Sequence, residues 1–399
     1  MEDVAVIGGG AAGCFAAVCL KRMVPQLRVT LFEASERPMS KLAVTGGGRC
    51  NLTNSFEGVT SLSKVYPRGE RLMKRALKTF GVADTLSWFE AEGVRFVLQD
   101  DHCYFPASQD AMEIVRTLAS ALRREGVEVR TNARLKALEP GWTLHFADGQ
   151  RVKADAVIVT TGGAPKGIPF LEGLGLEIIP PVPSLFTFKV PSPELRALMG
   201  LVVSAQLSIP GTKFRSEGPL LVTDWGLSGP AALRLSSYAA RELAERGYEA
   251  PLQINWLPET DVEKFLGEQL AAHPQKQLVS TPGPLPRRLW EMLCARAGLR
   301  NDIRWAEMGR KSMNRLAAVL SQDAYRIEGR AIFREEFVTC GGVSLSELDL
   351  STLESRRYPG LFFAGEVMDV DAVTGGFNLQ AAWTTGYLAA NGVKSRLTW

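Results

Sequence analysis

The N-terminal segment places a run of glycines between a β-branched apolar stretch and a helix-forming stretch. Residues 4–7 (VAVI) are typical of a buried strand, and residues 11–20 suit a helix that packs closely on a sheet. A second strand-like stretch follows at residues 28–33. This order of strand, glycine turn, helix and strand predicts a right-handed βαβ unit with parallel strands.

The glycines between strand and helix have the spacing Gly8-x-Gly10-x-x-Gly13. In dinucleotide-binding proteins the first glycine permits a tight turn, the second lets the backbone approach a pyrophosphate, and the third lets helix and strand pack closely. The helix N-terminus, with Ala12 in its first turn, offers free N–H groups to the phosphates. Glu33 ends the second strand, where its carboxylate can bind both ribose hydroxyls and would repel a 2′-phosphate. The pattern predicts a site for FAD or NAD.

Three further glycine-rich stretches follow along the chain. Residues 41–54 read KLAVTGGGRCNLTN and are expected to form a loop, and residues 160–165 (TTGGAP) end a buried strand. Near the C-terminus, Glu366 follows a strand, and a helix opens after Gly376. The N-terminus of that helix would face an electron-rich ring. FAD fits this second helix better than NAD, because a reduced flavin carries negative charge near N1 and O2.

The composition changes near residue 180, where prolines stand at positions 180, 181, 183, 191 and 193. Short alternating strands follow, and the pattern then becomes helical before strands return. We therefore expect a discontinuous FAD-binding domain over residues 1–185 and 337–399. The inserted substrate domain would cover residues 186–336, with a β part at about 186–258 and a helical part at about 259–325.

Length, charge and cysteine content bound the partners of this chain. It has 399 residues, and its 46 basic and 43 acidic side chains give a net charge of +3. Such a small excess does not indicate nucleic acid. The six cysteines form no Cys-x-x-Cys pair, so no metal site is expected. Without a leader-like segment or a membrane-length apolar run, we expect a cytoplasmic monomer or weak dimer that acts on a small molecule.

Four motifs together resemble one family. The segments GGGAAG, T-G-G-G-R-C-N-x-T-N, T-G-G and A-G-E-V-x-D-V-D-x-x-T-G-G-F-N-L-Q are similar to bacterial NAD(P)/FAD-dependent oxidoreductases. That family has aminoacetone-oxidase-like and bile-acid double-bond-reductase-like members, and it is more distantly related to fumarate-reductase-type flavoproteins. The resemblance covers essentially the whole chain. It implies a Rossmann-like, glutathione-reductase-type FAD domain interrupted by a β-plus-helical domain.

The resemblance also implies which residues bind FAD. Residues 46–54 would lie along the ribityl-flavin, with Lys41 and Arg49 facing the pyrophosphate or the reduced flavin. Glu366 would bind a ribityl hydroxyl, and the helix N-terminus near residue 378 would face the flavin pyrimidine through its N–H groups. The expected contacts are Gly8, Gly10, Ala12, Gly13, Glu33, Lys41, Gly46, Gly47, Gly48, Arg49, Cys50, Asn51, Leu135, Thr161, Gly162, Gly163, Gly365, Glu366, Gly376, Asn378 and Leu379.

No catalytic acid or base stands out, and four residues are weak candidates. Arg49 and Cys50 follow the triple glycine, although Cys50 has no second cysteine nearby and suits a packing role. Asp371 is equally compatible with a loop-capping turn. Relatives often have histidine at the position of Asp224, so an acid or base there would titrate in a different range.

Three functions remain open from the sequence. The favoured one is hydride transfer at flavin N5, in which NAD(P)H drives reduction of an activated double bond in a small apolar molecule. No second Gly-x-Gly-x-x-Gly pattern is present, so NAD(P)H would bind only transiently. The second is an oxidase of a small amine that produces hydrogen peroxide. The third is a flavin-bound redox sensor or interaction module without turnover.

Overall fold

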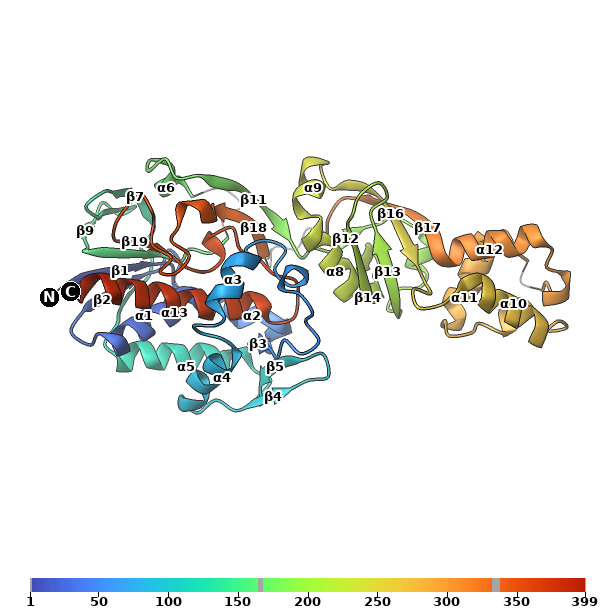
Figure 1. The fold of residues 1–399 in the computed structure, drawn as a ribbon, viewed down its shortest axis with the longest axis horizontal. Helices are drawn as coiled ribbons and strands as arrows, with labels where there is room; N and C mark the ends of the chain where they lie inside the picture. The colour runs from blue at the N-terminus through green and yellow to red at the C-terminus, as the bar shows by residue number, and fades with distance from the viewer. Residues whose placement is uncertain (1, 164–167, 301, 332–337, 399) are drawn as a thin grey trace. The chain divides into compact units, whose positions relative to one another are not determined.

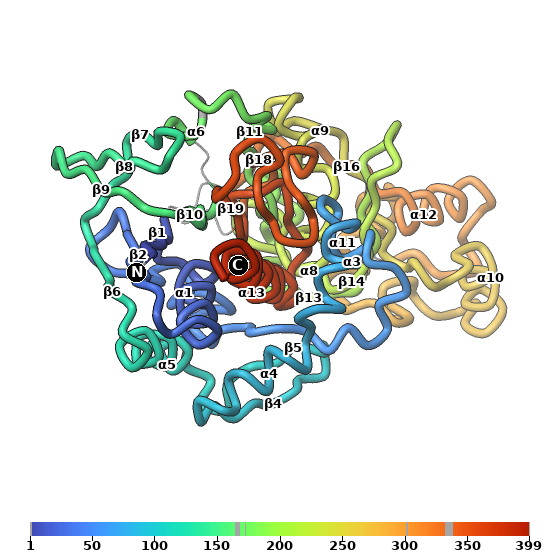
Figure 2. The backbone as a smooth tube through the Cα atoms, turned by 60° about the vertical axis from the view of Figure 1, so that its left-hand side comes forward, coloured from blue at the N-terminus to red at the C-terminus, as the bar shows by residue number. Residues whose placement is uncertain are grey.

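The computed structural model describes residues 2–163, 168–300, 302–331 and 338–398 (Figures 1 and 2). Contacts within the chain divide it into two compact units. We call Met1–Pro183 with Phe337–Trp399 the cofactor unit, and Ser184–Glu336 the inserted unit. Each unit is described by itself.

The cofactor unit is built on a five-stranded parallel sheet with the order β19-β10-β1-β2-β6. In β1, Val4 lies opposite Val29 of β2 on one side and Ala156 of β10 on the other. The predicted βαβ unit is therefore confirmed, with α1 as its crossover helix. The strands are β1 (Asp3–Ile7), β2 (Arg28–Phe32), β6 (Glu128–Arg130), β10 (Ala156–Val159) and β19 (Leu361–Phe363).

Two helices, α1 (Ala11–Met23) and α13 (Phe377–Leu397), lie side by side against this sheet (Figures 1 and 2). A Cβ atom at Gly386 of α13 would lie only 2.9 Å from the carbonyl oxygen of Ala12, so small residues permit this close packing. The other helices of the unit are α2 (Ser40–Gly48), η1 (Leu62–Lys64), α3 (Glu70–Ala76), α4 (Val82–Ala91), α5 (Ala111–Arg124), α6 (Pro169–Glu172), η4 (Leu345–Glu347) and η5 (Gly365–Val367).

Three small sheets surround the parallel sheet in the cofactor unit. Their orders are β3-β5-β4, β7-β8-β9 and β11-β18. The first brings residues 53–54 beside residues 103–104, and thereby fixes the end of the glycine-rich stretch. The strands are β3 (Thr53–Asn54), β4 (Phe96–Leu98), β5 (Cys103–Pro106), β7 (Leu135–Glu139), β8 (Thr143–Phe146), β9 (Arg151–Lys153), β11 (Ile178–Ser184) and β18 (Val338–Val343).

The inserted unit is built on a six-stranded antiparallel sheet with the order β12-β15-β14-β13-β16-β17. Its two edges approach each other, because Phe188 of β12 bridges to Arg330 and Lys189 donates to the carbonyl of Gly329 at 2.9 Å. The sheet is therefore barrel-like. Its strands are β12 (Phe188–Lys189), β13 (Val202–Ser208), β14 (Arg215–Val222), β15 (Gly226–Ser228), β16 (Glu249–Asn255) and β17 (Asp323–Glu328).

The helices of the inserted unit pack around a core that contains Trp256, Trp290 and Trp305, all buried. Strand β17 begins at Asp323, earlier than the end of the helical part expected at about residue 325, because it pairs with β16. Among the described residues, no helix is both long and apolar enough to cross a bilayer. The helices are α7 (Pro193–Arg196), α8 (Gly229–Tyr238), α9 (Ala240–Glu245), α10 (Val262–Ala272), η2 (Leu278–Ser280), α11 (Arg287–Arg296), η3 (Trp305–Glu307) and α12 (Arg310–Gln322).

Candidate cofactor site

The glycine turn between β1 and α1 contains two kinds of glycine. A Cβ atom at Gly8 would lie 2.5 Å from the carbonyl oxygen of Thr160, and one at Gly13 would lie 2.0 Å from the carbonyl oxygen of Gly8. These two glycines are required by the packing of the chain itself. A Cβ atom at Gly10 would meet no atom within 4 Å. The space beside Gly10, at the N-terminus of α1, is therefore open to a ligand.

The N-terminus of α1 has the electrostatics of an anion site. No acidic side chain lies in its first turn, where the N–H groups of Ala11 and Ala12 have no helical acceptor. Nearby, Glu33 ends β2 and its Oε2 accepts a hydrogen bond from Gly9 N–H at 2.7 Å, while Oε1 accepts from Ser35 N–H at 2.7 Å. These bonds hold a carboxylate near the glycine turn, where the adenosine ribose of a bound dinucleotide is predicted to lie.

Leu135 lies on the same side of the unit as Glu33. The N–H of Ala133 donates to the carbonyl of Glu33 at 2.8 Å, and Leu135 follows as the half-buried first residue of β7. The sequence contains no motif around this position. Its place beside the end of β2 suits an adenine contact, which stays a prediction.

Residues from β10, β18 and β19 meet next to this glycine turn. A Cβ atom at Gly163 would lie 2.8 Å from Glu366 Oε1, and one at Gly365 would lie 2.9 Å from the Cβ of Ala12. A Cβ atom at Gly162 would lie 3.8 Å from Glu366 Oε2, and Thr161 is exposed. The carboxyl ends of neighbouring parallel strands thus bring three predicted segments to one edge of the sheet, which is where ligands bind in open α/β sheets.

One buried polar atom at this edge, the Oγ1 of Thr339, has no hydrogen-bond partner in the described part of the chain. Thr339 is 1% exposed. Its N–H donates to Glu366 Oε1 at 2.5 Å, so the hydroxyl lies beside a residue expected to bind a ribityl chain. A buried hydroxyl without a partner is costly unless a ligand satisfies it. Together with the open space at Gly10, this atom fits a bound dinucleotide.

The stretch expected to be a loop at residues 41–54 begins instead as helix α2. Lys41 to Val44 are helical, and the helix is interrupted at Thr45, whose ψ is 148°. Gly46 and Gly47 then take φ values of 59° and 68°. The expectation of a loop is wrong for the first residues, because Leu42 is a helix former that buries its side chain in the core.

The three glycines of this stretch have separate roles. A Cβ atom at Gly46 would lie 2.8 Å from the N atom of Asn51, so the fold itself requires glycine there. Gly47 and Gly48 have positive φ, and a Cβ atom on either would meet nothing within 4 Å. Their bare backbone is open on one side. Lys41, one turn earlier, places Nζ 3.8 Å from Glu366 Oε2, which connects α2 to the edge of the sheet.

Asn51 connects this stretch to the N-terminus of α13. With its amide oriented to satisfy both partners, Asn51 donates to the carbonyl of Thr53 at 3.1 Å and accepts from Gly376 N–H at 3.2 Å. The first residues of α13 include Asn378 and Leu379, whose N–H groups have no acceptor within the helix. Asn378 uses its side chain for the preceding loop, accepting from Ala372 N–H at 2.8 Å.

Two of the four catalytic candidates lie beside the triple glycine. Arg49 is exposed, stacks 4.5 Å over the ring of Phe105 and donates to Gln109 at 3.4 Å. Cys50 is completely buried, and burial raises the pKa of its thiol to about 12. A thiol that stays protonated and shielded is a poor nucleophile. The structure thus favours the packing role of Cys50.

The other two catalytic candidates, Asp371 and Asp224, belong to different units of the chain. Asp371 is completely buried and forms a two-pronged ion pair with Arg68, whose Nε lies 2.5 Å from Oδ1. The ion pair adds a distant arginine to the environment of Asp371, and the loop-capping turn and the catalytic role considered for it both stay predictions. Asp224 is an exposed residue between β14 and β15 in the inserted unit. The structure does not place it relative to the cofactor unit.

A buried polar network at α13 is not apparent from the sequence. Thr53 Oγ1 donates to Gln380 Oε1 at 2.5 Å, and Gln380 Nε2 donates to the hydroxyls of Thr85 and Thr384 at 2.9 Å. Each of these side chains is fully buried. The network fixes the end of the glycine-rich stretch against the first turns of α13. A polar residue inside an apolar helix, as in the segment FNLQAAW, was the available signal.

Comparison with known proteins decides the family. The model of the HI0933-like protein Rossmann domain matches residues 2–392. The chain belongs to this HI0933-like family of FAD-dependent oxidoreductases. The match includes every segment at the edge of the sheet, so the resemblance inferred from four motifs is confirmed.

Two curated members of this family match the HI0933-like chain over nearly its full length. The 3-dehydro-bile acid delta(4,6)-reductase of Clostridium scindens is 30% identical and covers 99% of this chain and 100% of its own. The ribosomal RNA dihydrouridine synthase of Escherichia coli is 32% identical and covers 97% of each chain. Among solved structures, 3-ketosteroid-delta4-(5alpha)-dehydrogenase of Rhodococcus jostii has a TM-score of 0.50 at 13% identity, covering 99% of this chain and 96% of its own, which supports the fold alone.

Proposed function

We propose that this protein reduces a carbon–carbon double bond that is conjugated to a carbonyl group, with electrons supplied by NAD(P)H. Bound FAD would supply the hydride from N5, and a proton would complete the addition across the double bond. The observation that carries the proposal is the open backbone at Gly10 near Gly163 and Glu366 at one edge of the sheet, with Asn51 holding the α13 N-terminus to the glycine-rich stretch. Two curated relatives of this chain are named for the reduction of such bonds.

The reaction is common to the two relatives although their substrates differ in size. A 3-dehydro bile acid with double bonds at positions 4 and 6 carries those bonds in conjugation with its keto group. Uridine carries its reducible double bond in conjugation with a ring carbonyl, and its reduction gives dihydrouridine. In both molecules the carbonyl polarises the carbon that accepts hydride. The shared requirement is an electron-poor double bond, either in a small apolar molecule or in RNA.

The chain's own residues would bind the cofactor and hold its charge. The N–H groups at the N-terminus of α1 would bind the pyrophosphate, and Glu33 would bind the adenosine ribose. The N–H groups of Asn378 and Leu379, together with the positive end of the α13 dipole, would stabilise negative charge near flavin N1 and O2. Lys41 would add a cation near Glu366, from whose Oε2 its Nζ lies 3.8 Å. By stabilising the reduced, negatively charged cofactor, these groups would favour its reduction by NAD(P)H.

NAD(P)H is proposed as a transient donor. The sequence contains one dinucleotide pattern, and at the N-terminus of α1 this pattern would bind FAD. A nicotinamide would then have to reach the flavin face, leave after transfer, and be followed by the substrate in the same space. The six cysteines are buried and form no disulfide, which suits the reducing cytoplasm in which NAD(P)H is available.

The test is anaerobic mixing of the FAD-loaded protein with NADH and NADPH in turn, while the oxidised flavin band is recorded. Rapid bleaching by one of the two nucleotides is expected. A matched control is the Gly10→Leu variant, which fills the open space beside α1 and should contain little flavin while its inserted unit stays folded. Absence of bleaching by both nucleotides, with bleaching by a small amine and release of peroxide in air, would contradict the proposal and favour an amine oxidase.

A further inference from the structure

Helix α12 of the inserted unit carries an unusual distribution of charge. Its thirteen residues include Arg310, Lys311 and Arg315 and contain no aspartate or glutamate. All three cations are exposed, whereas Leu316 and Leu320 bury the opposite face in the core. An ordinary solvent-facing helix intersperses both signs of charge. The exposed side of α12 is uniformly positive.

Two of these cations stand where a helix least favours them. Arg310 and Lys311 are the first two residues of α12, next to the positive end of the helix dipole. By contrast, α10 begins with Asp261 as its cap and Glu263 in its first turn. The folding of α12 alone would favour acids at these positions. The cations therefore indicate an external negative partner.

These cations also lack acidic partners within the described part of the chain. Helix α11 begins with two arginines as well, but Arg287 pairs with Glu291 at 2.8 Å. Arg296 at the other end of α11 pairs with the buried Asp323 at 2.7 Å. No described carboxylate pairs with Arg310, Lys311 or Arg315, and Arg315 donates only to the hydroxyl of Ser312 at 3.3 Å.

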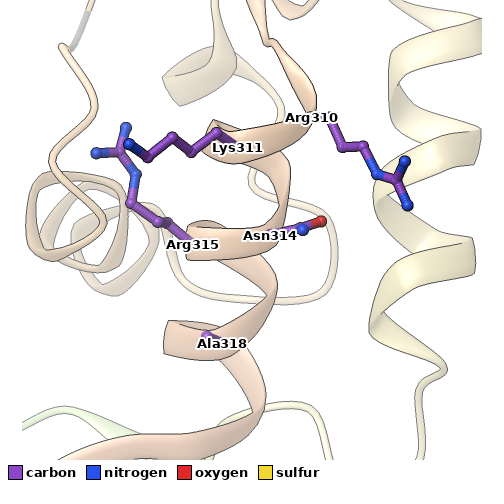
Figure 3. A pocket seen from close by; sticks show the side chains of 5 residues that line it. All are labelled: Arg310, Lys311, Asn314, Arg315 and Ala318. Carbon is purple, nitrogen blue, oxygen red and sulfur yellow. The ribbon is translucent and has the colours of Figure 1, made fainter.

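The cations border a hollow on the surface. Arg310, Lys311, Asn314, Arg315 and Ala318 line a cavity of about 540 Å³ (Figure 3). Figure 3 shows Lys311 and Arg315 extending to one side of the helix, and Arg310 and Asn314 to the other. The hollow is open to solvent rather than enclosed, and its donors are spread over two helical turns. A chain of phosphates fits this arrangement better than a single anion.

We propose that the exposed face of α12 is a docking surface for the phosphate backbone of RNA. Arginine forks and an asparagine amide are groups that bind phosphate and sugar oxygens, and the N–H groups of the helix N-terminus add to them. The net charge of +3, from which no nucleic-acid partner was expected, averages over the whole chain and does not represent this face. The inference rests on the proposed double-bond reduction, and it selects a uridine in RNA as the carrier of that bond.

The test measures RNA binding without turnover. The full-length, FAD-loaded protein is titrated into a fluorescein-labelled RNA hairpin with a uridine-rich loop, and anisotropy is recorded over a series of salt concentrations. Wild-type protein should bind. Combined Arg310→Glu, Lys311→Glu and Arg315→Glu substitutions should weaken binding by roughly tenfold or more and reduce the slope of log affinity against log salt by about 2–3.

A charge-matched control separates this face from net charge. Combined Lys213→Glu, Lys264→Glu and Arg326→Glu substitutions reverse three exposed cations elsewhere in the same unit. This control should bind the hairpin almost as well as wild type. Equal loss in both variants, unchanged binding after reversal of α12, or no binding by wild type would overturn the proposal. Equally tight binding of polyglutamate or of phosphatidylglycerol vesicles would overturn it as well, because the surface would then not select RNA.

Reduction of a small conjugated enone separates the two proposals. Both triple variants should reduce it at the wild-type rate, because neither changes the cofactor unit. If α12 reversal leaves RNA binding intact while the enone is reduced, the docking inference fails and the proposed function stands. If wild type binds RNA through α12 but reduces no conjugated double bond, the proposed function fails and the docking surface stands.

Discussion

The cofactor unit and the inserted unit present their chemistry in different ways. In the cofactor unit, bare backbone at Gly10, Gly47 and Gly48 and helix N-termini would form the proposed cofactor site. In the inserted unit, side chains on α12 form the charged surface. A site made of backbone requires glycine at fixed spacing, and therefore leaves a pattern in the sequence. A surface made of side chains requires only residue types that are common on any helix.

The largest expected difference lies within the glycine turn itself. Gly13→Val should destabilise the protein by more than about 4 kcal/mol, because its Cβ atom would lie 2.0 Å from a backbone carbonyl oxygen. Gly10→Ala should change the stability of the FAD-free protein by less than about 1 kcal/mol, since its backbone angles suit alanine. It should nevertheless lower FAD affinity. Urea unfolding and flavin content of the purified variants check both. An equal loss of stability in the two variants would contradict the separate roles given to Gly13 in packing and to Gly10 in FAD binding.

The next effect concerns the ion pair of Asp371. Asp371→Asn should cost about 3–5 kcal/mol in the free energy of unfolding, because it removes the carboxylate that pairs with the buried guanidinium of Arg68. Asp3→Asn removes one partner of the exposed pair with Arg28 and should cost at most about 1 kcal/mol. Urea unfolding of both variants measures the contrast. A cost below about 1 kcal/mol for Asp371→Asn would show that the pair does not hold the loop before α13.

A smaller effect of opposite sign is expected in the inserted unit. Combined Arg310→Glu and Lys311→Glu substitutions should raise the free energy of unfolding by about 0.5–2 kcal/mol, because acids complement the dipole at the start of α12. Thermal unfolding at low ionic strength measures the change. A loss of stability would mean that these cations serve the fold, and the argument for an external anion would lose its basis.

The smallest effect at neutral pH concerns Cys50. Burial raises the pKa of its thiol from 9.0 to about 12, so the protonated form is favoured in the folded state. Its contribution to stability is complete below pH 9 and is lost as the pH rises through 12. Folded protein should resist alkylation of Cys50 at neutral pH, and Cys50→Ala should still be reduced by NAD(P)H. Mass spectrometry after alkylation tests the first point, and loss of flavin reduction in the variant would restore a catalytic role.

The sequence predicted those parts of the fold and site that depend on local pattern. The βαβ unit follows from short-range periodicity, and the open space at Gly10 follows from the spacing of the glycine turn. An acidic side chain was expected where the second strand ends, and Glu33 lies directly after β2. These features are formed by residues close together in the chain. The local sequence is therefore enough to predict them.

Features formed by distant residues could not be predicted. Arg68 and Asp371 pair across most of the chain, and neither neighbourhood indicates the other. The unpartnered hydroxyl of Thr339 depends on packing against Gly163 and Glu366. The uniform charge of α12 was present in the sequence, but its meaning required knowledge of which face is buried and which neighbours lack carboxylates.

The most direct test of double-bond reduction is a single turnover in the absence of oxygen. The FAD-loaded protein is first reduced by NADPH or NADH, and the excess nucleotide is removed. A conjugated dienone steroid or the uridine-containing RNA hairpin is then added while the flavin band is recorded. The proposed function predicts that the oxidised flavin returns with one of these acceptors, and that the acceptor gains two hydrogen atoms by mass spectrometry. Return of the flavin band only when air is admitted, with both acceptors unchanged, would contradict it.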